Sequence, residues 1–335
     1  MKTLSIIFVN YKTADLLIDC LHSIFQFKKT WELDIIVVDN DSKDGGKERV
    51  LTLFPFVRWF ETGYNAGFAR ANNLGIKHAN GEIVLLLNTD TIVHEDAVQR
   101  SATRLSELEA AAVGVQLLNP DGSPQISGNY FMTGSLNNLL PLPFLGPLLR
   151  WMAFQFKVKK TNIPEAVSEV EVDWINGAFL MVTRKAIEQV GPLDEDFFLY
   201  AEEAEWCSRL RKAGKLIVLG ELNVTHLQGA SAIATVGLDA KGYQQITGKK
   251  GGQMILSNLV RIRKQYGLLW YFFHVLILFG EIPILFIGGI LESILKFNRF
   301  RQRFGFACQY AKTIALLTPF LLKLFANKPT FYKVM

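Results

Sequence analysis

The stretch Gly81-Glu-Ile-Val-Leu-Leu-Leu-Asn-Thr-Asp90 decides the fold of this 335-residue chain. Its aliphatic part, residues 83–87, shows no alternation of polar and apolar side chains. It therefore predicts a strand buried on both faces of a parallel sheet covered by helices. Asn88 and Asp90 follow at the carboxyl end of that strand, the edge where open α/β sheets bind ligands. Oxygen-bearing side chains in such a turn can hold a divalent cation against a diphosphate, so the working hypothesis is a nucleotide-sugar site.

The rest of the first 118 residues supports this sheet, because apolar strand patterns alternate with helical periodicity, as in a doubly wound α/β layer. The second half repeats the alternation. Strands are expected at 4–9, 35–38, 57–61, 112–116 and 215–219, with a strand pair or bent strand at 170–182. Helices are expected at 16–27, 68–78, 95–107, 183–190, 202–213 and 251–266.

Residues 119–164 lose this periodicity and are rich in Pro, Gly and Asn. A loop of this length is typical of a functional flap or an insertion. The expected domains are a nucleotide-sugar-binding half (1–118), the insertion (119–169), an acceptor-binding and catalytic half (170–250) and a helical, apolar and basic C-terminal region (251–335).

Charge is divided unevenly along the chain. The formal net charge is +5, yet residues 294–335 hold eight Lys and Arg and no Asp or Glu, which leaves 28 basic against 31 acidic residues elsewhere. This division predicts an anionic partner for the tail alone. Anionic lipid is favoured over nucleic acid, because the tail contains no recognisable nucleic-acid-binding motif.

The apolar run at 268–291 is long enough to cross a bilayer, which takes about 20 apolar residues. Pro283 and Glu281 interrupt it and favour two short helices lying in the membrane interface. A true span and an ordinary core or oligomer interface are the alternatives. Three scattered cysteines and the absence of a signal-peptide pattern at the start predict a cytoplasmic location on the inner face of the cell membrane.

Seven motifs in collinear order resemble a family 2 glycosyltransferase of the GT-A fold, rhamnosyltransferase-like branch, over about residues 1–230. Four lie in the first half: Ser5-Ile-Ile-Phe-Val-Asn-Tyr11, Val37-Val-Asp-Asn40, Asn65-Ala-Gly-Phe-Ala69 with Asn72-Asn73, and Leu87-Asn-Thr-Asp90. Three lie in the second: Asp173-Trp-Ile-Asn-Gly-Ala178, Leu193-Asp-Glu-Asp-Phe-Phe-Leu-Tyr200 and Glu202-Glu-Ala-Glu-Trp-Cys-Ser-Arg-Leu210. The resemblance implies a mixed α/β sheet flanked by helices and transfer of a sugar from a nucleoside diphosphate sugar.

The nucleotide is expected at the first strand ends. The resemblance implies that Asp39 accepts the imino N–H of a uracil or thymine ring, and the alternative is a helix cap. Asn10 and Tyr11 are expected to line the nucleoside pocket. A polar strip at the start of the next helix suits ribose or phosphate oxygens, or simple solvation. That strip contains Asn65, Gly67, Asn72 and Asn73.

The metal ligand predicted first is Asp90, because Asn88 occupies the second position of the motif and is not a carboxylate. Mg²⁺ or Mn²⁺ keeps several waters and is completed by the diphosphate, so one carboxylate can suffice. His226 is the second candidate, on the resemblance, and its alternative is a structural histidine.

Glu203 is the predicted catalytic base and Glu202 the second choice, because inverting transfer needs one carboxylate to deprotonate the acceptor hydroxyl. The family usually has Asp where Glu203 stands. Glu205 is expected to brace the helix through Arg209. An acidic first helical turn is the alternative reading of the cluster. Trp174, Asn176 and Gly177 are expected to shape the donor or acceptor site, and Asp194 and Asp196 to hold the loop before the base.

The function predicted is a metal-dependent inverting glycosyltransferase for cell-surface polysaccharide, with a dTDP- or UDP-sugar as donor and a glycan or lipid-linked glycan as acceptor. Rhamnose is the first choice of sugar by resemblance. A homodimer is one possible assembly, and nucleic acid is not an expected partner. The alternatives are a sugar nucleotidyltransferase, disfavoured because residues 10–13 are not a Gly-rich phosphate loop, and an inactive nucleotide-binding membrane scaffold.

Overall fold

The structure is a computed structural model that describes residues 2–28, 30–158, 161, 163–227, 246–296 and 300–335. Contacts divide these residues into two compact units. The first, here the sheet unit, contains the described residues of Met1–Phe131, Thr161–Glu195 and Glu202–Ala240. The second, here the helical unit, contains those of Met132–Lys160, Asp196–Ala201 and Lys241–Met335. The domain boundaries expected from sequence remain predictions. Contacts group residues 132–160 of the insertion with the C-terminal helices.

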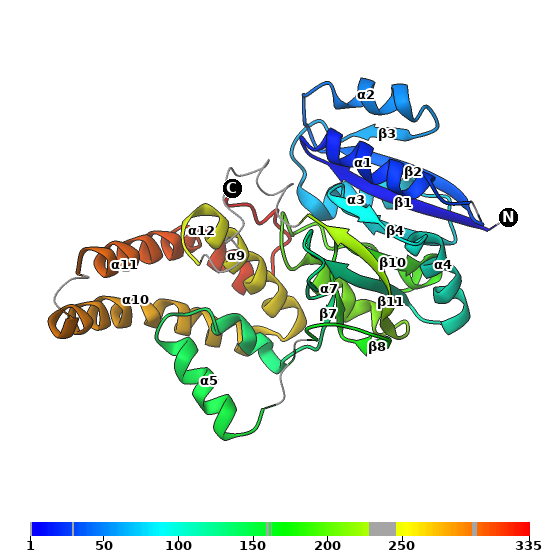
Figure 1. The fold of residues 1–335 in the computed structure, drawn as a ribbon. Coiled ribbons are helices and arrows are strands. Elements are labelled where there is room, and N and C mark those ends of the chain that lie inside the picture. Colours follow the sequence, from blue (N-terminus) through cyan, green and yellow to red (C-terminus); the bar gives the residue numbers. More distant parts are fainter. Residues whose placement is uncertain (1, 29, 159–160, 162, 228–245, 297–299) are drawn as a thin grey trace. The chain divides into compact units, whose positions relative to one another are not determined.

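The sheet unit is built on a mixed sheet of nine strands (Figure 1). Its order is β3-β2-β1-β4-β10-β6-β11-β5, with β8 also paired to β11. The strands are β1 (Thr3–Asn10), β2 (Glu32–Asp39), β3 (Arg58–Glu61), β4 (Ile83–Leu87), β5 (Thr91–Val93), β6 (Ala112–Leu118), β8 (Glu169–Val172), β10 (Phe179–Thr183) and β11 (Leu216–His226). A separate pair joins β7 (Gly128–Asn129) to β9 (Trp174–Ile175).

Helices cover both faces of this sheet, as expected. They are α1 (Ala14–Phe25), α2 (Gly46–Leu53), α3 (Gly67–His78), α4 (Ala97–Leu108), α6 (Arg184–Val190) and α7 (Glu202–Leu210). All five residues of β4 are buried, with no alternation of buried and exposed positions, and this confirms the predicted two-sided burial. In β1, Ile6 belongs to the buried cluster that also contains residues of α1 and α4. Ile7 faces α3 instead, since a Cβ added to Gly75 of that helix would lie 2.4 Å from Ile7 Cγ2.

β11 runs further than predicted, since it continues from the expected strand to His226. Its register shifts between Leu219 and Asn223, and the later part pairs with β6 and with β5. The three-residue strand β5 was not predicted, nor was the pairing of Thr91 with His226. These two departures from the prediction build much of the site described below.

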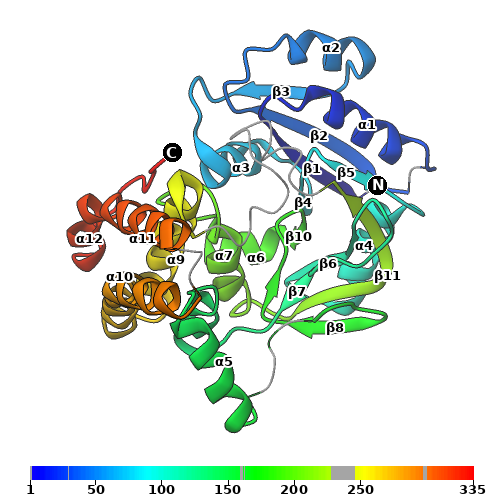
Figure 2. The same ribbon diagram turned by 60° about the vertical axis from the view of Figure 1, so that its left-hand side comes forward.

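The helical unit contains six helices among the residues that the structure describes. They are the 3₁₀ helix η1 (Thr133–Leu139) and the α-helices α5 (Leu145–Gln155), α9 (Gly248–Gln265), α10 (Leu268–Lys296), α11 (Phe300–Ala315) and α12 (Thr318–Phe325). α10 and α11 lie side by side (Figure 2). The prediction of an irregular segment at 119–164 is therefore wrong where η1 and α5 form.

The prediction of two short helices at 268–291 is also wrong, because α10 is one 29-residue helix with Pro283 inside it. Proline removes one helical hydrogen bond, a loss that packing against a neighbouring helix can offset. Leu268–Leu291 is long and apolar enough to cross a membrane by length and composition. Only 28% of its most apolar window is buried within the protein.

Candidate active site

The carboxyl ends of β1 and β2 bring Asn10 and Asp39 together, as the predicted nucleotide site requires. The two residues are direct partners in the parallel register. Asn10 is fully buried, and its Nδ2 donates to Asp39 Oδ1 at 2.7 Å. Asp39 Oδ2 accepts the Ser42 N–H at 2.9 Å, so this carboxylate also shapes the turn after β2. Each carboxylate oxygen has a second lone pair, which leaves Asp39 able to accept a further donor.

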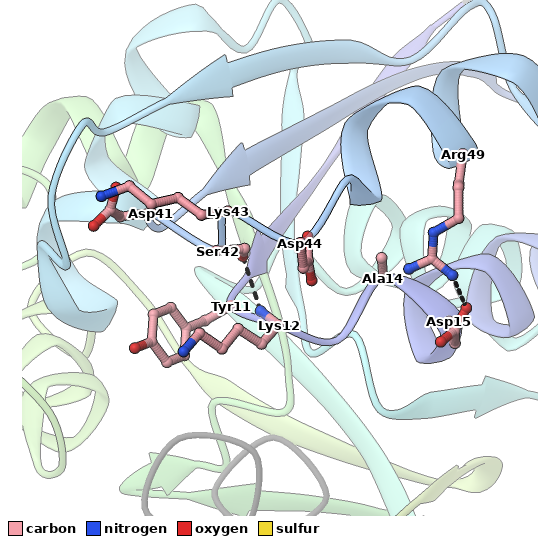
Figure 3. Close-up of a pocket in the computed structure, with 9 residues that line it drawn as sticks. All are labelled: Tyr11, Lys12, Ala14, Asp15, Asp41, Ser42, Lys43, Asp44 and Arg49. Atoms are coloured by element: carbon pink, nitrogen blue, oxygen red, sulfur yellow. Dashed lines mark hydrogen bonds and ion pairs between the residues drawn. The ribbon is translucent and has the colours of Figure 1, made fainter.

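An open pocket of about 620 Å³ is lined by Ser42, which hydrogen-bonds to both Asn10 and Asp39, and by Tyr11, the residue after Asn10 (Figure 3). The pocket is lined by the turns after β1 and β2, by the start of α1 and by Arg49 of α2. Ser42 Oγ accepts the Lys12 N–H at 2.8 Å and thereby ties the two turns together. The residues that line the pocket are Tyr11, Lys12, Ala14, Asp15, Asp41, Ser42, Lys43, Asp44 and Arg49. The structure thus brings Tyr11 to a pocket next to Asn10 and Asp39.

Asn40 organises the polar strip before α3, a role that the sequence did not predict. Its Oδ1 accepts the Ala66 N–H at 2.7 Å, and its Nδ2 donates to Asn65 Oδ1 at 3.1 Å. Gly67 begins α3 with φ of 74°, a conformation that glycine adopts without steric cost. Asn65 and Gly67 therefore lie next to the end of β2, as expected for residues near the nucleotide.

The other two asparagines of the strip face the protein. Asn72 is 1% exposed, and its Nδ2 donates to the Phe68 carbonyl one turn earlier in α3. This corrects the prediction that Asn72 contacts ribose or phosphate or is solvated. Asn73 exchanges hydrogen bonds with the backbone of Leu193, at 2.8 and 3.0 Å. It fastens the loop that leads toward Glu202.

Asp90, which follows β4, lies against His226 at the end of β11. The pairing of β5 with β11 places His226 opposite Thr91, and its Nε2 lies 3.5 Å from Asp90 Oδ1. Asn88 Nδ2 lies 3.3 Å from the same nitrogen. Asp90 is 1% exposed and His226 6% exposed, so both side chains are held in place by their surroundings. The three residues predicted around the metal are thus brought together.

Gln125 sets the tautomer of His226. Its Nε2 donates to the His226 carbonyl at 2.7 Å and to Asn119 Oδ1 at 2.9 Å, which fixes the orientation of the amide. Gln125 Oε1 is therefore the acceptor for His226 Nδ1, 3.0 Å away, and Nδ1 carries the proton. The lone pair of Nε2 then points toward Asp90 and Asn88. Sequence reasoning missed Gln125 because it lies in the segment without periodicity.

These donors fit a divalent cation. Ligands about 2.1 Å from an octahedral cation are about 3.0 Å apart when adjacent and about 4.2 Å apart when opposite. The 3.5 Å between Asp90 Oδ1 and His226 Nε2 is about 0.5 Å longer than the adjacent spacing, so a small side-chain movement would let both atoms bind one cation as adjacent ligands. An Nδ1–H bound to an amide oxygen is the support usually found behind a metal-binding histidine. Groups of three or more His, Cys, Asp or Glu suited to a metal are absent from the part of the chain that the structure describes. Water and phosphate oxygens would complete the coordination.

The glutamates at the start of α7 differ in exposure. Glu202 is 3% exposed, whereas Glu203 is partly exposed. Glu205 is 6% exposed and forms a bidentate pair with Arg209, whose Nη2 lies 2.8 Å from Glu205 Oε2. Arg209 also donates to the carbonyls of Val190 and Pro192. The predicted bracing role of Glu205 is therefore confirmed.

Glu203 lies near the predicted metal ligands. A Cβ built on Gly177 would lie 3.4 Å from Glu203 Cγ, so the Glu203 side chain packs against the Gly177 backbone. The next residue, Ala178, accepts the Asn88 N–H at 3.0 Å. Glu203 thus packs against Gly177, and the neighbouring Ala178 bonds to the turn that carries Asp90.

Trp174 and Asn176 support this region from β9 and the following turn. Asn176 uses its side chain within the protein, where it donates to the Ile126 carbonyl and accepts the Ala178 N–H. Trp174 is partly exposed, and its indole N–H has no hydrogen-bond partner among the described residues. The structure thus gives Asn176 a framework role, and it buries the Trp174 indole nitrogen although the residue as a whole is partly exposed.

Residues 5–162 match the family described as "Glycosyl transferase family 2". The chain is 27% identical over 221 residues to a low-salt glycan biosynthesis hexosyltransferase of Haloferax volcanii, which covers 63% of this chain and 62% of that protein. It is 30% identical over 204 residues to an N-acetylglucosaminyl-diphospho-decaprenol L-rhamnosyltransferase of Mycobacterium tuberculosis, covering 56% of this chain and 63% of the relative. The matched region thus spans somewhat less than two thirds of the length of these relatives.

Solved structures share the fold at low sequence identity. GalNAc-T7 with UDP, GalNAc and Mn²⁺ superposes with a TM-score of 0.55 at 14% identity, over 81% of this chain and 50% of that chain. A mannosyltransferase from Pyrobaculum calidifontis with GDP-Man and Mn²⁺ superposes with a TM-score of 0.51 at 15% identity, over 97% of this chain and 87% of that chain. The expected mixed sheet flanked by helices is confirmed. Residues 5–162 therefore match glycosyltransferase family 2, the fold is that of the GT-A glycosyltransferases, and the chain is similar to rhamnosyltransferases and glycan hexosyltransferases.

Proposed function

We propose that this protein transfers a sugar from a nucleoside diphosphate sugar to a glycan or lipid-linked glycan acceptor of the cell surface. The observation that carries the proposal is the pairing of Asp90 with His226 after β4, with Glu203 packed against Gly177, whose neighbour Ala178 bonds to the same turn. The pocket lined by Tyr11 gives the nucleoside a place at the same sheet edge. Relatives named as a hexosyltransferase and a rhamnosyltransferase support a hexose or rhamnose as the sugar.

Two parts of the site would hold the donor. Asp39 would accept the imino N–H of uracil or thymine, with Asn10 and Ser42 fixing the carboxylate. Asp90 Oδ1 and His226 Nε2 would bind Mg²⁺ or Mn²⁺, and this ion would neutralise charge on the departing diphosphate. Both solved structures described above contain Mn²⁺, which supports a divalent ion.

Glu203 would act on the acceptor. Its carboxylate would take the proton of the acceptor hydroxyl as that oxygen bonds to the anomeric carbon. The bond from the anomeric carbon to the diphosphate breaks on the opposite face, and its electron pair leaves with the nucleoside diphosphate, which inverts the configuration. The partly exposed Glu203 suits this role better than the buried Glu202, since a base must touch its substrate.

The test is nucleoside diphosphate release from dTDP-rhamnose and a panel of UDP-hexoses, with Mn²⁺ and a membrane lipid extract as acceptor source. Glu203→Gln should lower the rate about 10²–10⁴-fold. The rate of nucleoside diphosphate release by Asp90→Ala should no longer depend on Mn²⁺. Anomeric configuration of the product, read by NMR, tests inversion. If no donor yields nucleoside diphosphate, the proposal that the protein is a glycosyltransferase is refuted. If Glu203→Gln is fully active and Glu202→Gln is inactive, the base is Glu202.

We also propose that the helical unit binds an anionic membrane surface. The sequence ranges of this unit hold 18 Lys and Arg against three Asp and Glu, whereas those of the sheet unit hold 18 against 28. Large apolar side chains of the unit are exposed, including Leu276 of α10 at 70% and Phe154 of α5 at 79%. Apolar side chains beside basic charge are typical of helices that lie in a membrane interface.

Vesicle flotation tests this surface. The protein should bind vesicles containing phosphatidylglycerol, bind phosphatidylcholine vesicles weakly, and lose binding as salt rises. Leu276→Asp and Phe154→Asp should weaken flotation while leaving nucleotide binding unchanged. Equal binding to neutral vesicles at high salt would argue against the electrostatic part, and resistance to alkaline carbonate would indicate a span by α10.

A further inference from the structure

The segment Asp196–Ala201 ends directly before Glu202, and it packs within the helical unit. Asp196 is its main anchor. Its Oδ2 forms an ion pair with Lys264 Nζ at 2.6 Å, and its Oδ1 accepts the Thr330 N–H at 2.8 Å. The Asp196 carbonyl accepts the Tyr332 N–H at 2.9 Å. The residues just before the proposed base are thus held by α9 and by the C-terminal segment 330–333, here the strap.

Further contacts continue along the same segment. Phe197 is fully buried and forms a parallel bridge with Tyr332. The next ring, Phe198, packs edge-on against Phe331 with centroids 5.6 Å apart. The Leu199 carbonyl accepts a hydrogen bond of 2.7 Å from Ser257 Oγ in α9. Four consecutive residues are therefore fixed from the helical unit.

The backbone after these contacts is strained. Tyr200 and Ala201 have φ of 73° and 65°, which places two successive non-glycine residues in the left-handed region. Side chains disfavour this conformation, and it persists where the surroundings impose it. α7 begins at the next residue, so these two torsions set the direction in which the first turn, with Glu203, leaves the loop.

On the sheet-unit side the chain is fixed as well. Before the segment, Arg70 Nε donates to the Glu195 carbonyl at 3.0 Å and Asn73 binds Leu193. After it, Trp206 Nε1 in α7 donates to the Gly191 carbonyl at 2.9 Å. The left-handed pair therefore lies between two clamped stretches, and loss of the contacts to Asp196–Leu199 lets it relax.

We infer that Lys264 and the strap are positioning residues for Glu203, which they hold in place by imposing the left-handed turn at Tyr200 and Ala201 on the loop before α7. The inference rests on the proposed function of Glu203. It assigns the C-terminal helices a role in catalysis that is separate from membrane binding. A misplaced base slows proton transfer, while the donor site formed by Asp39, Asp90 and His226 is unaffected.

The test is Lys264→Met in the full chain. Proton transfer depends steeply on geometry, so kcat should fall on the order of 10²-fold, while the KM for the donor stays within about twofold. Lys264→Arg, which keeps the ion pair, should restore most of kcat. Lys212→Met, at an exposed lysine of the sheet unit, is the matched control and should behave as wild type.

A second variant also removes the negative charge of Asp196, whose ion pair with Lys264 is lost in Lys264→Met. Asp196→Asn combined with Lys264→Met should regain thermal stability but keep the low kcat. Ala201→Gly added to it should recover part of kcat, because glycine adopts the left-handed conformation without cost. Recovery of kcat together with stability in the double variant would overturn the inference.

Hydrogen–deuterium exchange tests, without an activity assay, whether Lys264 and the strap hold the loop before α7 in place. In Lys264→Met, amides of the peptide containing Tyr200 to Cys207 should exchange about tenfold faster, and those of β1 and β4 should not change. Unchanged exchange in that peptide refutes the positioning role of Lys264 even if the enzyme is active. If exchange is faster but the protein uses no sugar donor, the role of Lys264 in holding the loop stands and the proposed function is refuted.

Discussion

Gln125→Met is the sharpest test of the proposed cation site. Methionine has a similar volume but no amide, so His226 Nδ1 loses its acceptor at 3.0 Å and the imidazole can adopt the other tautomer. Loss of such a support typically costs 10–100-fold in metal affinity, which is about 1.4–2.7 kcal/mol. The same change removes the donor to the His226 carbonyl, and a buried acceptor left without its donor costs about 1–3 kcal/mol of folding stability.

Gln116→Met separates these two effects. Gln116 is also buried, donates to the carbonyls of Leu117 and Gln125, and accepts the Ala166 N–H, whereas the His226 ring bonds to Gln125 and Asn88. Both variants should therefore lose similar stability in urea unfolding. In Mn²⁺ titrations followed by electron paramagnetic resonance in the presence of UDP, only Gln125→Met should bind Mn²⁺ more weakly. Wild-type Mn²⁺ affinity in folded Gln125→Met would refute the role given to His226.

Three further predictions concern stability and reactivity. Arg209→Met should lower the free energy of unfolding by about 3–5 kcal/mol, because it leaves the buried Glu205 carboxylate without its cation, and a loss under about 1 kcal/mol in urea would contradict the bracing role. Burial raises the pKa of Glu281 above its ordinary 4.5, so ionisation destabilises the fold as pH rises past 4.5; Glu281→Gln should be more stable than wild type at pH 7 and lose this advantage near pH 4. Burial also raises the pKa of Cys20 to about 12, so a thiol reagent at pH 8 should label Cys308 in the folded protein and spare Cys20.

Sequence patterns predicted the strands that end at Asn10, at Asp39 and directly before Asn88, because strands buried on both faces leave long aliphatic runs. Polar residues directly after such runs must lie at one sheet edge when the strands are parallel. The register of β1 with β2 and with β4 confirms this for all three. The resemblance added the roles, and the pairing of Glu205 with Arg209 followed from helical spacing alone.

The partners of His226 could not be predicted in the same way. β5 has only three residues, too few to show a period, and its pairing with β11 joins residues more than 130 positions apart. Gln125 lies in a segment whose composition predicts only turns. Its contacts depend on where the chain folds back after β6, which local propensity does not encode. The role of Asn40 was missed because its neighbour Asp39 offered a more obvious chemistry.

The surroundings of the turn Asn88–Thr91 would favour cation binding at the proposed site, which has one carboxylate. Thr89 Oγ1 bonds to Thr13 Oγ1 at 2.9 Å, and Thr91 Oγ1 donates to the Asn88 carbonyl at 2.8 Å. The Asp90 carbonyl accepts the Leu227 N–H, so β11 fixes the same turn from its other side. A ligand held this firmly loses little entropy when the ion binds, and preorganisation can offset a missing second carboxylate. Thr89→Val should therefore weaken Mn²⁺ binding although Thr89 is not itself a proposed ligand, and unchanged affinity in a stable Thr89→Val protein would count against this explanation.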